Sequence, residues 1–184
     1  MDIPSELGVF RIFPREILAI IISFCPRDCW NLNKYFRILS YAILPFEEKQ
    51  RAFLHACSTC GYLELLNILL KDRGVNPGEK LNTAIRYASA EGRLEVVKRL
   101  LQDERVNPGD FGNEAIITAS TFGHLEIVEI LLRDERVDPS DRNNRALVRA
   151  LQGGKLKIVQ RLLSDERVKG KVNADFHVKY SHLF

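Results

Sequence analysis

The 184-residue sequence lacks the features of secreted and membrane-anchored proteins. It has four cysteines, too few for a disulfide scaffold, and no Asn-x-Ser/Thr site for N-glycosylation. Its longest mainly apolar run, residues 17–24, is too short to span a membrane and is not followed by a signal-peptide cleavage pattern. We therefore expect an intracellular, cytoplasmic protein that does not engage a membrane.

The sequence also lacks a strong excess of charge of one sign. Its 27 basic and 24 acidic residues give a net charge of +3, and the two signs alternate along most of the chain. Proteins that bind nucleic acid need a broad positive field, which such a mixture does not supply. We therefore expect no nucleic-acid partner.

No arrangement of residues typical of catalysis is present. The four histidines are scattered, and none lies at a spacing from a serine or cysteine that suggests a nucleophile held next to a base. They are His55, His124, His177 and His182. We predict no catalytic residue and no cofactor, and hence a chain that is not an enzyme.

What the sequence does contain is an internal repeat of 31 residues. Each repeat has a glycine, then a leucine with further aliphatic residues, and finally a leucine pair, at spacings that place the apolar side chains on one face of a helix. The four glycines are Gly61, Gly92, Gly123 and Gly154. The pattern predicts a helix after each glycine turn.

A second, shorter helix is predicted before each of the last three glycines, where small alanines recur. An asparagine stands ahead of each, and we expect its side chain to cap the first turn of that helix. These asparagines are Asn82, Asn113 and Asn144. Prolines in the loops between units stop the helices. Because one unit cannot bury its own apolar face, the pattern predicts an all-α solenoid of about four helix-turn-helix units.

Residues 123–128 read Gly-His-Leu-Glu-Ile-Val, and the leucine pair follows them. At these positions the sequence resembles the ankyrin repeat family, over about residues 51–168. The resemblance implies four units, at 51–78, 79–109, 110–140 and 141–168, that act as a protein–protein interaction module. It further implies a protein target on the concave surface, and we expect a monomer.

Between an N-terminal arm at 1–12 and the repeats, residues 13–50 carry a second pattern. Pro14, Glu16 and Ile17 are followed by Leu18 and Ile21, and this order resembles the opening of an F-box. The resemblance implies binding to the Skp-type adaptor of a cullin-RING ubiquitin ligase, with the repeats selecting the substrate. The residues implied in adaptor binding are Pro14, Ile17, Leu18, Ile21 and Trp30.

The alternative is that residues 13–50 only cap the solenoid, because the terminal unit of a repeat protein needs a soluble outer face. The chain would then be a plain ankyrin-repeat binding or scaffold protein. An F-box-like segment joined to short repeats is similar to F-box/ankyrin proteins of large DNA viruses, whose place of action would be the host cytoplasm.

In the ankyrin family, ligands meet the loop tips and the end of the first helix, and here those positions differ between repeats. The candidate partner-binding residues are Glu79, Lys80, Glu91, Asp110, Phe111, Thr121, Phe122, Asp141, Arg142 and Gln152. Phe111 and Phe122 are apolar at positions that the pattern exposes. Each is either an anchor for a partner or a ring that folds onto its own repeat.

A charged Asp-Glu-Arg triplet follows each of the last three long helices, at residues 103–105, 134–136 and 165–167. We interpret these triplets as a solvated seam with weak ion pairs between adjacent repeats, or as a functional acidic ridge. The tail after them, residues 169–184, is either a partial cap or a mobile end.

The cysteines at 25, 29, 57 and 60 have a spacing that resembles zinc ligands. Cys57, however, occupies the repeat position held elsewhere by Ala88, Ala119 and Ala150. We therefore predict that Cys57 is a small buried packing residue and that the chain has no metal site.

Overall fold

The computed structural model describes residue 50, residues 53–54 and 56–57, and residues 63–172. The N-terminal arm and nearly all of the F-box-like segment lie outside the described residues, as do residues 173–184. The five residues implied in adaptor binding therefore have no described position.

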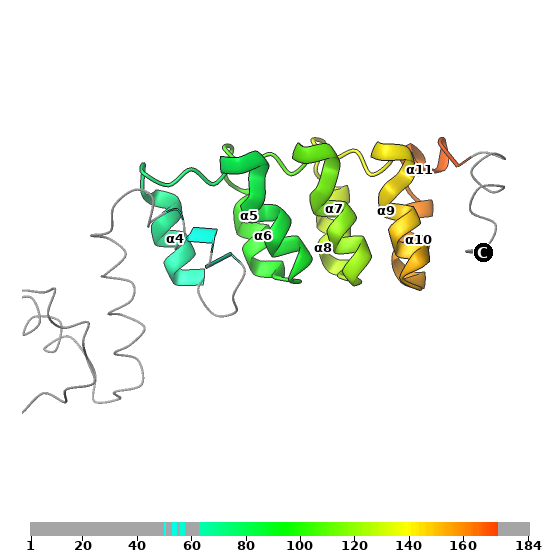
Figure 1. Cartoon of the computed structure of the whole chain (residues 1–184), viewed down its shortest axis with the longest axis horizontal. Coiled ribbons are helices and arrows are strands. Elements are labelled where there is room, and N and C mark those ends of the chain that lie inside the picture. The colour runs from blue at the N-terminus through cyan, green and yellow to red at the C-terminus, as the bar shows by residue number, and fades with distance from the viewer. Residues whose placement is uncertain (1–49, 51–52, 55, 58–62, 173–184) are drawn as a thin grey trace, which may run out of the picture. The chain divides into compact units, whose positions relative to one another are not determined.

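The described residues form helices joined by short loops, as Figure 1 shows. In chain order the helices are α4 (Leu63–Lys71), α5 (Glu79–Ala90), α6 (Leu94–Leu101), α7 (Asp110–Phe122), α8 (Leu125–Leu132), α9 (Asp141–Gln152), α10 (Leu156–Leu163) and α11 (Glu166–Lys169). The predicted all-α architecture of paired helices is confirmed.

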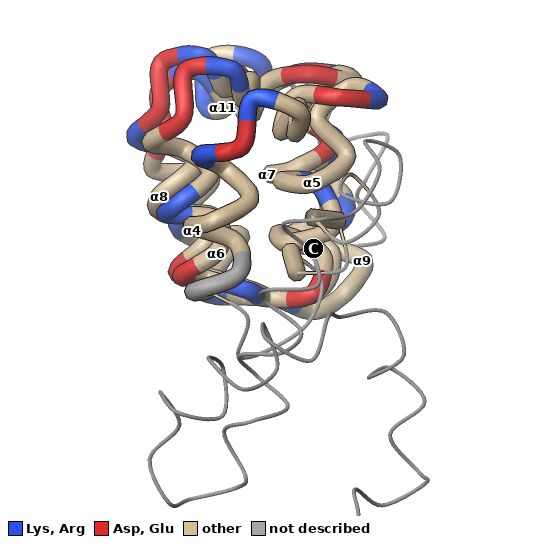
Figure 2. The backbone as a smooth tube through the Cα atoms, turned by 90° about the vertical axis from the view of Figure 1, so that its left-hand side faces the viewer, with Lys and Arg blue, Asp and Glu red and all other residues tan. Residues whose placement is uncertain are grey.

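The helices of residues 63–172 form two layers (Figure 2). In the first layer α5 contacts α7, and α7 contacts α9. In the second layer α4, α6, α8 and α10 contact one another in the same order. Most of these helices are too short to be stable alone in water, so their stability comes from the stacking of successive pairs.

The core between the layers repeats the same residues at the same positions. Ala88, Ala119 and Ala150 of the first layer are fully buried, which lets the helices approach closely. The buried leucines Leu100, Leu131 and Leu162 fill the second layer. A buried valine also follows each second-layer helix, at Val75, Val106, Val137 and Val168. Burial of each such aliphatic side chain contributes about 1.5–3 kcal/mol.

Each first-layer helix contains a short left-handed turn just after its first residue, at residues 80–82, 111–113 and 142–144. All nine of these residues have φ between 51° and 64°. Residues with a Cβ are disfavoured there by about 1–2 kcal/mol each, although asparagine and glycine tolerate the conformation best. The turn therefore needs contacts that hold it in place.

The asparagine that ends each turn supplies such contacts, and our prediction that it caps its own helix is wrong. Asn82 Oδ1 accepts a hydrogen bond from the backbone N–H of Asn107, at 2.8 Å, and its Nδ2 donates to Asp110 Oδ2 at 2.6 Å. Asp110 belongs to the next repeat, and Asn107 lies in the loop that leads to it. Asn82 is 3% exposed, so its side chain is a buried polar link between two repeats.

Asn113 repeats these bonds one unit later. Its Oδ1 accepts from the N–H of Asp138 at 2.8 Å, and its Nδ2 donates to Asp141 Oδ2 at 2.9 Å. We call this series of asparagine bonds, to the connecting loop and to the next repeat, the asparagine ladder. It ends at Asn144, whose buried Oδ1 has no hydrogen-bond partner. The equivalent amide, of Lys169, donates instead to Asp165 O within its own turn.

The end of the ladder provides a matched test of what the bonds contribute. Asn113→Gly removes two hydrogen bonds, one to the loop of its own repeat and one to Asp141 of the next repeat, whereas Asn144→Gly removes a side chain whose Oδ1 is unpaired. Glycine keeps the left-handed backbone accessible in both variants. We expect Asn113→Gly to lower the free energy of unfolding by about 1–3 kcal/mol more than Asn144→Gly, measured by urea denaturation. Equal losses would show that the ladder does not stabilise the stack.

Candidate protein-binding surface

The surface of the first-layer helices carries different side chains in each repeat. Equivalent positions at the left-handed turn hold Lys80, Phe111 and Arg142, and all three are exposed. Seven residues further along each helix, the equivalent positions hold Tyr87, Thr118 and Arg149. The core keeps its residues from repeat to repeat, so this variation is not imposed by packing.

The sequence-predicted partner residues fall into two groups on this surface. The exposed ones are Lys80, Glu91, Phe111, Phe122, Arg142 and Gln152. The partly buried ones are Glu79, Asp110, Thr121 and Asp141. Asp110 and Asp141 are also held within the stack, because both accept hydrogen bonds from the asparagine ladder. Glu79, at the equivalent position, has one buried oxygen without a hydrogen-bond partner.

Phe111 neither stands free nor folds onto its own repeat. Its ring lies 4.6 Å from the guanidinium of Arg86 in the preceding repeat and 5.3 Å from that of Arg142 in the following one. Cations over an aromatic face are attracted by its quadrupole. The ring is still 47% exposed, and Phe122 at the end of α7 is 57% exposed. Phe111 thus links three repeats and leaves part of its ring at the surface.

The far ends of the first-layer helices are fixed by glycine turns. Gly92 has φ of 71°, and a Cβ built on it would lie 2.6 Å from the ring of His124 in the next repeat. His124 Nε2 lies 2.9 Å from the carbonyl oxygen of Ala90. His124 therefore joins two adjacent turns, which gives it a structural role within the stack.

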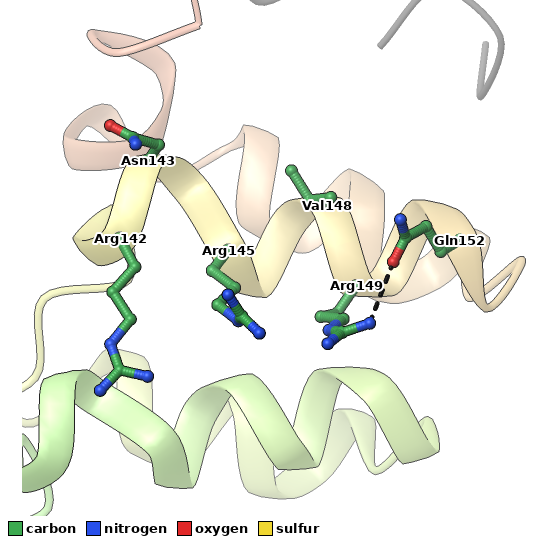
Figure 3. Close-up of a pocket in the computed structure, with 6 residues that line it drawn as sticks. All are labelled: Arg142, Asn143, Arg145, Val148, Arg149 and Gln152. Carbon is green, nitrogen blue, oxygen red and sulfur yellow. Dashed lines mark hydrogen bonds between the residues drawn. The ribbon is translucent and has the colours of Figure 1, made fainter.

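A hollow of about 250 Å³ runs along α9 (Figure 3). Its lining residues are Arg142, Asn143, Arg145, Val148, Arg149 and Gln152. In Figure 3 the three arginine side chains extend from α9 toward α7. Of these, only Arg142 and Gln152 are among the partner-binding residues predicted from the sequence. The signal for Arg145 and Arg149 was three arginines spaced at i, i+3 and i+7 on a predicted helix.

The charged triplets hold the loops together, but not by ion pairs between repeats as we predicted. Arg136 Nε and Nη2 donate to the two carboxylate oxygens of Asp134, at 2.9 and 2.7 Å, within one triplet. Its third nitrogen, Nη1, donates to the carbonyl oxygen of Val106 in the preceding repeat at 2.7 Å. The guanidinium therefore connects the repeats through a backbone carbonyl.

The other two triplets make the same contacts and one more. Arg105 also donates to the carbonyl oxygen of Leu70 at 2.8 Å, and Arg167 to that of Leu132 at 3.0 Å. These carbonyls lie at the ends of α4 and α8, where a positive charge is favoured by the helix dipole. We call the three arginines with their aspartates the arginine clamps. They explain the triplets without a functional acidic ridge.

Each clamp lowers the pKa of its aspartate. Hydrogen bonds from the paired arginine are the largest cause for Asp103, Asp134 and Asp165, and burial opposes them in part. The same pairing raises the pKa of the arginines. The carboxylates thus stay ionised below the usual range of aspartate.

Cys57 is a fully buried free thiol, as its repeat position predicts. Burial raises its pKa to about 12, so the thiol stays protonated at neutral pH. A protonated, buried thiol is a poor metal ligand and a poor nucleophile. Cys25, Cys29 and Cys60 lie outside the described residues.

Comparison with known proteins supports the assignment of the repeats. Residues 85–175 match the family model for ankyrin repeats, in three copies. No match was found among the curated proteins or among the solved structures. Among the described residues, no helix has the length and apolar character that crossing a membrane requires.

The arginine clamps predict a specific dependence of stability on pH. Because the folded-state pKa of Asp134 is lower than its unfolded value near 4, its pairing stabilises the fold at neutral pH. That contribution is lost as the pH falls below about 4 and through the lower folded-state pKa. We expect Arg136→Gln to cost about 1–2 kcal/mol at pH 7 and progressively less below pH 4, in urea titrations at each pH.

Glu135→Gln is the matched control, because Glu135 is the exposed middle residue of the same triplet. We expect it to change the free energy of unfolding by less than about 0.5 kcal/mol. A cost for Arg136→Gln that is constant with pH would contradict the pairing described for Asp134.

Proposed function

We propose that this protein, whose residues 85–175 match the family model for ankyrin repeats, is a substrate-recruiting adaptor of a cullin-RING ubiquitin ligase. In this proposal the repeats bind a protein target through the first-layer surface, and residues 13–50 bind the Skp-type adaptor of the ligase. The protein contributes binding and orientation, and no catalytic step.

The target-binding half of the proposal rests on the contrast between core and surface. Ankyrin repeats form protein–protein interaction modules. In this chain buried positions recur, whereas the exposed first-layer positions change from lysine to phenylalanine to arginine between successive repeats. The ladder and the clamps fix the repeats relative to one another, so the surface is preorganised, which lowers the entropic cost of binding.

The ligase half rests on the F-box resemblance of residues 13–36. Pro14, Leu18 and Ile21 stand where that family places residues of its opening helix. The competing function is a plain binding or scaffold protein in which the same segment only caps the first repeat. The two differ in one respect, since only the adaptor leaves residues 13–50 free to engage a second protein.

A binding experiment with the purified full-length chain and a purified Skp-type adaptor separates these functions. We expect the wild type to bind the adaptor and Pro14→Ala and Leu18→Asp to bind at least about tenfold more weakly, measured by calorimetry. Circular dichroism must show that the repeats of each variant remain helical.

Phe122→Ala is the matched control, because Phe122 is exposed on the repeats and lies far along the chain from residues 13–50. Its affinity for the Skp-type adaptor should equal that of the wild type. No binding by the folded wild type would contradict the ligase function and leave the plain binding protein.

A further inference from the structure

We propose that the arginine stripe on α9, formed by Arg142, Arg145 and Arg149, binds an acidic segment of the target protein. The proposal rests on the proposed function to the extent that the repeats bind a protein. It adds the chemistry of the recognised segment, carboxylates presented by an extended chain.

The three arginines differ in how far the protein itself neutralises them. Arg142 donates to the carbonyl oxygen of Phe111 at 2.7 Å and forms an ion pair with Glu114 at 3.2 Å. Arg149 has only a 3.3 Å hydrogen bond to Gln152, and no described contact engages the Arg145 side chain. Within residues 63–172, neither Arg145 nor Arg149 forms an ion pair.

Two exposed like charges one helical turn apart destabilise a helix by about 0.2–0.5 kcal/mol. Packing does not require this arrangement. The residues equivalent to Arg145 are Thr83 and Glu114, and those equivalent to Arg149 are Tyr87 and Thr118. The stripe is therefore specific to one repeat, and an anionic ligand would relieve its repulsion.

The geometry suits carboxylates on an extended chain. Arg145 and Arg149 are four residues apart on α9, which corresponds to a rise of about 6 Å. Alternate side chains of an extended strand lie about 6.6–6.8 Å apart on one face. Acidic residues at every second position would thus meet successive guanidinium groups, each of which can bind a carboxylate through two hydrogen bonds.

The surroundings of the stripe favour a protein over a nucleic acid. Glu114 of α7 contacts Arg142, and Asp141 begins α9, so a continuous phosphate backbone would meet carboxylates as well as arginines. The apolar rings of Phe111 and Phe122 are exposed on α7, the helix that contacts α9. A mixed surface of this kind suits a protein segment with acidic and apolar residues.

The probe is a fluorescein-labelled 12-residue peptide with glutamate at alternate positions, and its neutral twin has glutamine instead. Binding to the full-length protein is measured by fluorescence anisotropy at low and physiological salt. We expect the acidic peptide to bind the wild type more tightly than the neutral twin, and more weakly as salt rises. The double variant Arg145→Gln/Arg149→Gln should lose at least about tenfold in affinity.

The control variant is Arg133→Gln/Lys157→Gln, which removes the same net charge from exposed positions outside α9. Its affinity for the acidic peptide should stay within about twofold of the wild type, because a screened charge outside the contact contributes little. Three results would overturn the proposal: no preference for the acidic peptide, equal losses in both double variants, or tighter binding of a single-stranded RNA of equal charge.

This experiment fails separately from the test of the ligase function. If the protein binds the Skp-type adaptor but not the acidic peptide, the proposal for the arginine stripe is rejected and the ligase function is retained. If it binds the acidic peptide but not the Skp-type adaptor, the stripe is retained as the target site of a plain binding protein.

Discussion

The structure depends on one constraint: a single repeat cannot satisfy its own loop and left-handed turn, so their polar groups must be paired by the neighbouring repeat. The buried side chains of Asn82 and Asn113 meet this constraint by bonding a carboxylate of the next unit and a backbone amide of the loop that leads to it. The arginine clamps meet it from the opposite direction, since each guanidinium reaches back to a carbonyl of the preceding unit. Hydrophobic stacking supplies most of the stabilisation, and these polar links fix the register.

The same constraint positions the surface that we assign to binding. The left-handed turns place Lys80, Phe111 and Arg142 at equivalent exposed positions. The backbone conformation there is the same in each repeat, and only the side chain differs. Phe111 also lies between arginines of the two flanking repeats. A target that meets several repeats therefore meets side chains whose spacing is set by the stack.

Much of this fold was predictable from the sequence, because the 31-residue period and its apolar positions record the core directly. Cys57 was correctly placed in the core because it replaces an alanine of that period. The role of Asn113 was not predictable from local rules, since an asparagine ahead of a helix looks the same whether it caps that helix or bonds a residue 25 positions away. Arg145 and Arg149 were missed for a related reason, because only the stacked helices show which charges are left without partners.

Residue-resolved hydrogen–deuterium exchange of the native protein tests the central claim most directly. The backbone amides of Asn107 and Asp138 lie in the loops that lead to the next repeat, yet each donates to the buried asparagine at the start of its own repeat. If the asparagine ladder holds the stack together, both amides will exchange as slowly as the core helix amides of Val97 and Val128, because opening them requires freeing the asparagine side chain that also bonds the next repeat. Exchange at the rate of an unprotected loop would contradict this role of the asparagines and leave hydrophobic stacking and the arginine clamps as the basis of the register.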